Sequence, residues 1–166
     1  MGPLMRAIGA LGLGAAFSVG SASAPAEDAC ARAHARADSS RAAEVSALLG
    51  ETPDGARLAA SGTRAPVVCF GDGEGGVTPE GIAILDRAAP PRAQAARLAH
   101  LWQHAHDGAP RAAPASGEAC DAWLAEVERA EARGDATEAR VAGALGVASR
   151  AGGRSSRDAS YRARCP

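Results

Sequence analysis

The stretch that decides the fold reads AARLAHLWQHAHDG and occupies residues 95–108. It follows the proline pair Pro90–Pro91, a common start for a helix, and it ends at Gly108, a common stop. His100 and His104 are four residues apart, so on a helix their side chains point the same way and can share one metal ion. The stretch therefore predicts a helix that carries a candidate metal-binding pair.

A helical wheel separates two faces of this helix. The residues that we expect to face the core are Gln94, Leu98, Leu101, Trp102 and Ala105. The two histidines lie on a different side, beside alanines and Arg97, and His106 points away from them. This separation predicts an open cleft in which the histidine pair is lined by small residues.

Residues 1–26 have the pattern of a secretory signal peptide. One arginine precedes an apolar run at residues 7–19, which is too short to span a bilayer. The small residues of Ala24–Ala26 fit a cleavage site. We therefore expect export to the periplasm or the extracellular space, and one mature domain at residues 27–166 with no transmembrane segment.

The composition bears on partners and on origin. The formal net charge is −1 at pH 7, which gives no reason to expect nucleic-acid binding. The chain has no lysine and no asparagine and is rich in alanine and arginine, a bias typical of GC-rich bacterial genomes. Residues 149–166 form an arginine-rich tail, expected to be solvated and partly disordered, with an acidic partner or an anionic lipid surface as the alternative.

Four cysteines, far apart in the sequence, predict two disulfides. They are Cys30, Cys69, Cys120 and Cys165. An even number in an exported chain favours disulfide bonds, and the absence of a C-x-x-C pair argues against a four-cysteine zinc site. Four cysteines allow three pairings. We favour Cys30–Cys69 with Cys120–Cys165. Each of these bonds would join the two ends of a segment that plausibly runs out and returns antiparallel to itself.

Local signals divide the remaining chain into helices and strands. We expect helices over about residues 28–49, 53–62 and 118–145, strands over 66–70 and 82–85, and a loop over 110–117. The predicted fold class is α+β, mainly helical, with a two- or three-stranded antiparallel sheet packed on the histidine helix.

A glycine-rich turn joins the two expected strands. Gly71, Gly73 and Gly76 match the dinucleotide-binding pattern G-x-G-x-x-G. That pattern needs a helix directly after it, whereas here a strand follows, and the acids Asp72 and Glu74 would repel phosphate. We therefore interpret the turn as a hairpin-like connection.

The order of these elements resembles the minimal zincin-type metallopeptidase. The resemblance covers about residues 66–146. Its parts are GIAILD at 81–86 as the edge strand, AARLAHLWQH at 95–104 as the metal helix, and residues 120–145 as the helix that supplies a third ligand. The resemblance implies zinc as the cofactor, with His100 and His104 as its first two ligands.

In such families the third ligand is often a glutamate on the following helix. On a wheel of that helix, Glu131 and Glu138 border the apolar face, whereas Glu128 and Asp135 lie farther toward solvent. Glu131 is therefore the first choice for the third ligand and Glu138 the second. The alternative is that these acids are all solvated and paired with arginines one turn away.

The resemblance fails at one position that the reaction needs. In H-E-x-x-H the glutamate takes a proton from the zinc-bound water, but the stretch HLWQH has Leu101 in that place. Loss of a general base costs about 10²–10⁴ in rate, so we expect no peptidase activity. Three functions stay open: a secreted zincin-like pseudoenzyme with a binding or structural role, a metal-binding protein or hydrolase with an atypical base, and an extracellular helical interaction module whose histidines are incidental.

Overall fold

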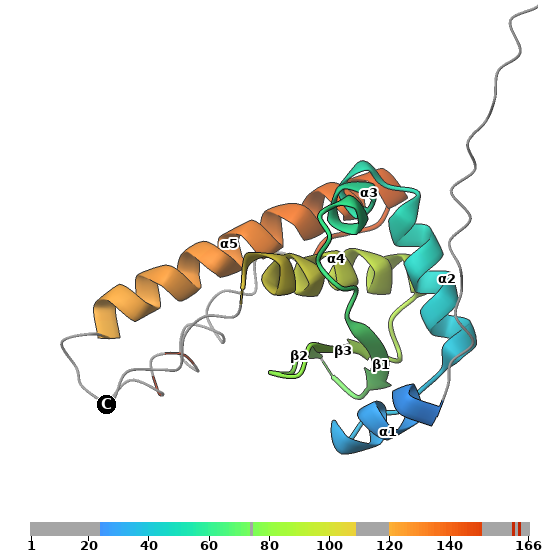
Figure 1. The fold of residues 1–166 in the computed structure, drawn as a ribbon. Coiled ribbons are helices and arrows are strands. Elements are labelled where there is room, and N and C mark those ends of the chain that lie inside the picture. Colours follow the sequence, from blue (N-terminus) through green and yellow to red (C-terminus); the bar gives the residue numbers. More distant parts are fainter. Residues whose placement is uncertain (1–23, 74, 109–119, 151–160, 162, 164–166) are drawn as a thin grey trace, which may run out of the picture.

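The described part of the chain is built mainly from helices, with one small sheet beside them (Figure 1). The computed structural model describes residues 24–73, 75–108, 120–150, 161 and 163. Its elements are α1 (Ala24–Arg32), α2 (Ser39–Gly50), α3 (Pro53–Ala60), β1 (Val67–Gly71), β2 (Gly76–Val77), β3 (Ile82–Asp86), α4 (Pro91–Asp107) and α5 (Cys120–Leu145). The predicted α+β class is confirmed.

Two helices begin where local signals predicted. The side chain of Thr52 caps α3 by accepting a hydrogen bond from the backbone N–H of Gly55 at 3.1 Å, and Pro53 occupies the first turn. The histidine helix α4 begins directly after Pro90, whose backbone is extended. It ends at Gly108, whose φ of 85° lies where glycine is favoured.

The helix expected over residues 28–49 is wrong, because the structure has α1 and α2 separated by a short irregular segment. In this segment His34 has a φ of 53°, which breaks the helical path. Arg36 then pairs with Phe70 of β1 through two backbone hydrogen bonds of 2.8 and 2.9 Å. Asp38 caps α2 by accepting from the backbone N–H of Arg41 at 2.9 Å.

The sheet is mixed, so the expectation of an antiparallel sheet is wrong. The strand order is β1-β3-β2, with β1 parallel to β3 and β2 antiparallel to β3. The glycine-rich turn leads into the two-residue strand β2, and it is β2 that forms the antiparallel pair. Gly75 has a φ of 68°, and a Cβ there would collide with the carbonyl oxygen of Ile84, so the turn requires glycine at this position.

The core lies between the sheet and the helices, with α4 at its centre. This helix packs against α2, α3, α5 and β3. The larger residues of the main core cluster are Val45, Leu49, Leu58, Phe70, Leu85, Leu98, Leu101, Val141 and Leu145. The sheet therefore covers one side of α4, and α2, α3 and α5 pack on its other sides. The side chains of the two histidines on α4 are surrounded accordingly.

A disulfide between Cys30 and Cys69 ties α1 to β1, as predicted. The two cysteines are 39 residues apart in the sequence. A cross-link over a loop of this length stabilises the fold by about 4 kcal/mol in the chain-entropy model. Cys120 is also disulfide-bonded. Its predicted partner, Cys165, lies outside the described residues.

Other expectations also fall partly outside the described residues. They concern residues 1–23 of the expected signal peptide, the loop at 110–117 and most of the tail at 149–166. The helix α1 begins within the last residues of the expected signal peptide. Among the residues that the structure describes, no helix is both long enough and apolar enough to cross a membrane.

Candidate metal centre

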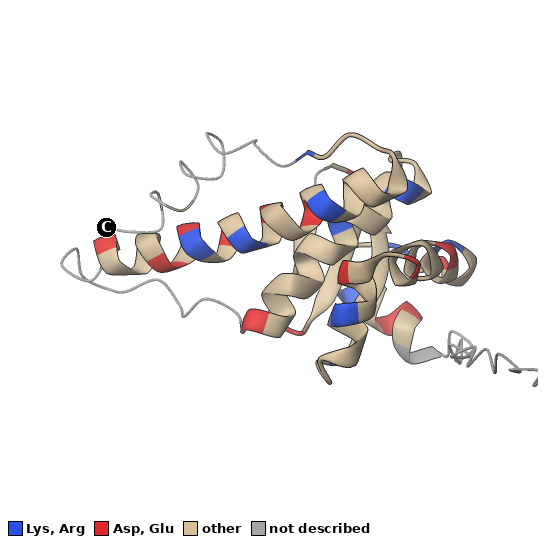
Figure 2. Ribbon diagram, turned by 90° about the horizontal axis from the view of Figure 1, so that it is seen from above, with Lys and Arg blue, Asp and Glu red and all other residues tan. Residues whose placement is uncertain are grey.

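The candidate site lies between α4 and α5, which run antiparallel. The guanidinium of Arg92 near the start of α4 donates to the carbonyl oxygen of Leu145 at the end of α5 at 3.1 Å. Further along α4, His104 lies opposite Glu131 of α5. Figure 2 shows acidic and basic positions alternating along α5. The antiparallel packing of α5 on α4 brings some of these acidic residues against the histidine face of α4.

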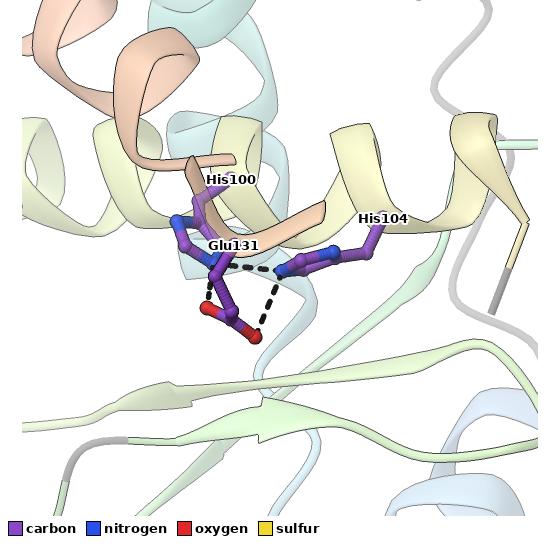
Figure 3. Close-up of side chains that lie close together, drawn as sticks. All are labelled: His100, His104 and Glu131. Carbon is purple, nitrogen blue, oxygen red and sulfur yellow. Dashed lines mark hydrogen bonds and ion pairs between the residues drawn. The ribbon is translucent and has the colours of Figure 1, made fainter. Parts of the chain in front are cut away.

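The histidine pair meets a carboxylate of α5 (Figure 3). The Nε2 atoms of His100 and His104 are 2.9 Å apart. The two carboxylate oxygens of Glu131 lie 3.3 Å from Nε2 of His100 and 3.4 Å from Nε2 of His104. The structure thus brings together the two histidines and the first-choice glutamate of the sequence analysis.

These separations are close to those of a metal's ligand shell. Zinc binds nitrogen and oxygen ligands at about 2.0–2.2 Å, which places two ligands of a tetrahedral ion about 3.3 Å apart. The two distances to Glu131 match this value, and the distance between the two nitrogens is a few tenths of an ångström shorter. These three residues could therefore hold a metal ion.

The histidines are buried, so the expected open cleft is wrong. His100 is 1% exposed and His104 is 8% exposed. The close approach of α5 explains this burial. At Gly134 a Cβ would lie 2.9 Å from both Cε1 and Nε2 of His100, so only a residue without a side chain lets the imidazole pack against α5. Gly134 is the reason that α5 can cover the histidine face.

The other ring nitrogen of His100 faces two more carboxylates. Its Nδ1 lies 3.2 Å from Oδ1 of Asp135 and 3.5 Å from Oε2 of Glu138. The expectation that Asp135 points to solvent is wrong, since its side chain is only 14% exposed. Glu138, the second choice for the third ligand, groups with Asp135 on this side of the ring instead of with His104.

The environment sets the charges of the site. Burial lowers the pKa of His100, which favours the neutral imidazole. Burial alone would raise the pKa of Glu131, but the two imidazoles and the hydroxyl of Tyr161 outweigh it and hold that pKa well below its usual range. A neutral imidazole beside an ionised carboxylate is the combination that metal ligation requires.

Tyr161 is a site residue that the sequence analysis missed. Its hydroxyl donates to Oε1 of Glu131 at 2.9 Å, and its ring meets that of Trp123 edge to face with centroids 6.1 Å apart. It lies in the arginine-rich tail, where no periodic pattern singled it out. The sequence offered one signal for this residue, because Tyr161 is the only tyrosine of the chain.

Leu101, the residue after the first histidine, lies in the core. Leu101 is 2% exposed and is part of the main core cluster. Its side chain therefore contributes to packing, and the neighbouring helical position supplies no proton acceptor to the histidine pair.

Comparison with protein-family models, with curated proteins and with solved structures gave no match to this chain.

Proposed function

We propose that this chain binds one transition-metal ion of the zinc class through His100, His104 and Glu131, and that it does not hydrolyse peptides. The convergence of two Nε2 atoms and one carboxylate, at separations close to those of a zinc shell, carries the proposal. The ion would link α4 to α5 and leave one coordination position for water or a partner's ligand. This corresponds to an exported, zincin-like pseudoenzyme with a binding or structural role.

The donor set selects the class of metal. Two imidazoles and one carboxylate suit zinc and related transition metals, whereas calcium and magnesium prefer shells made entirely of oxygen. The burial of both histidines also favours a metal that sheds its hydration shell for nitrogen ligands. When bound, such an ion polarises a coordinated water, but Leu101 places no base beside it.

The test is the zinc content of the purified chain, measured by elemental analysis and by titration against a competing chelator. We expect one zinc per chain in the wild type and loss of zinc in Glu131→Gln and His104→Ala. Glu131→Gln keeps the shape of the side chain, so it tests ligation with little effect on packing. His106→Ala is the matched control, because His106 is an exposed histidine on the same helix.

Two results would contradict the proposal. A folded wild-type chain that takes up no zinc, or a Glu131→Gln chain that keeps full affinity, would exclude this ligand set. Peptidase activity on a mixed peptide library that is abolished by a chelator and by Glu131→Gln would overturn the pseudoenzyme part alone.

A further inference from the structure

The second ring nitrogen of His100 has no role in the ligand set described above. Nδ1 is buried and makes no hydrogen bond of standard geometry among the described residues. It lies between Oδ1 of Asp135 and Oε2 of Glu138, at 3.2 and 3.5 Å. A buried polar atom without a well-aligned partner is uncommon, and Nδ1 here faces two carboxylate oxygens, one of which also pairs with Arg97.

The two neutral tautomers of His100 meet these surroundings differently. With the proton on Nε2, the lone pair of Nδ1 would face both carboxylates, and this contact is repulsive in a buried environment. With the proton on Nδ1, both carboxylates attract it. The lone pair of Nε2 then faces one carboxylate, Oε2 of Glu131 at 3.3 Å, instead of two, and Nε2 of His104, 2.9 Å away, can donate to it while no metal is bound.

We propose that Asp135, assisted by Glu138, is a positioning residue that holds His100 in the tautomer with the proton on Nδ1, so that Nε2 presents its lone pair to the metal. This inference extends the proposed function. Glu138 is itself held in place, because its Oε2 lies 3.3 Å from the guanidinium of Arg97 and its Oε1 accepts from the backbone N–H of Arg150 at 3.1 Å. Carboxylates that fix a ligating histidine in this way raise metal affinity.

The same atoms would also suit a second metal ion bound by Nδ1, Asp135 and Glu138. The position of Arg97 disfavours this alternative. Its guanidinium pairs with the carboxylate oxygen of Glu138 that faces Nδ1, and a second cation at that oxygen would be repelled. Nδ1 is therefore assigned as the protonated nitrogen of the ring, which faces the two carboxylates.

The tautomer is measured by ¹⁵N NMR of the histidine rings in the metal-free full chain. In the wild type we expect His100 to carry its proton on Nδ1. In Asp135→Asn the side-chain amide can donate to Nδ1, so we expect the population to shift toward the Nε2 tautomer. Glu128→Gln, an exposed acid on the same helix, is the control and leaves the tautomer unchanged.

The affinity for zinc gives a second measurement. We expect Asp135→Asn to weaken binding by about 10- to 100-fold while the stoichiometry stays at one zinc per chain. A wild-type His100 protonated on Nε2, or an Asp135→Asn chain with unchanged tautomer and affinity, would overturn the inference. So would two zinc ions per chain with the second lost in Asp135→Asn. Because the NMR measurement needs no metal, a failure of zinc binding as such is told apart from a failure of this inference.

Discussion

The Gly134→Ala variant is expected to lose zinc binding by about 100-fold or more, although the residue is no ligand. The added methyl group would lie 2.9 Å from two ring atoms of His100, well inside a normal contact of about 3.5–4.0 Å. The imidazole cannot retreat easily, because it is 1% exposed and its own helix α4 is packed against α2, α3 and β3. We therefore expect the ring to leave the position in which its Nε2 faces His104 and Glu131.

The control for this prediction is Gly143→Ala on the same helix, where a Cβ would have no neighbour within 4 Å. Replacing a helical glycine by alanine stabilises by up to about 1 kcal/mol. Overpacking costs about 1–3 kcal/mol, so the free energy of unfolding of Gly134→Ala should fall below that of Gly143→Ala by this amount. Urea unfolding and zinc titration check both effects. Equal stability and equal affinity of the two variants would show that the close contact does not exist.

The parts of the fold that could be predicted are those with local signals. Pro90–Pro91 and Gly108 bound the histidine helix, and Thr52 with Pro53 starts α3, because caps and prolines act on the residues next to them. The two apolar β-branched runs became β1 and β3 within a residue at each end. No local pattern indicated that these two strands pair in parallel, because the direction of pairing depends on the path that the connecting segment takes between them.

The candidate site likewise has features that the sequence could predict and features that depend on tertiary packing. The spacing of His100 and His104 and the position of Glu131 follow from the helical repeat, and the structure brings these three residues together. The wheel gave no information on what would cover the histidine face. Gly134 of α5 allows this helix to approach the histidine face closely, and the approach places Asp135 and Glu138 beside His100. The approach is a tertiary effect, so local patterns assigned Asp135 to solvent.

Introducing a glutamate at position 101, which would complete the pattern H-E-x-x-H, is expected to destabilise the protein strongly and to produce no peptidase. Leu101 lies in the core, so Leu101→Glu would put a carboxylate among apolar side chains instead of beside the histidine pair. A buried charge without a partner costs about 3–5 kcal/mol, and the variant also loses the burial of the leucine. Urea unfolding measures the loss, and Leu101→Met, which keeps the volume, should cost less than about 1.5 kcal/mol.

The pH dependence of the stability of Leu101→Glu distinguishes a glutamate that is buried in the core from one that reaches the metal. Burial would raise the pKa of the new carboxyl group above its unfolded value, so the destabilisation is smallest in acid and grows as the pH rises toward neutrality. A glutamate beside a bound zinc ion would instead stay ionised and leave stability at neutral pH nearly unchanged. Chelator-sensitive cleavage of peptides by a stable Leu101→Glu chain would therefore mean that position 101 faces the metal, and that a single substitution removed the activity of a peptidase. The burial of Leu101 in the core predicts the opposite result.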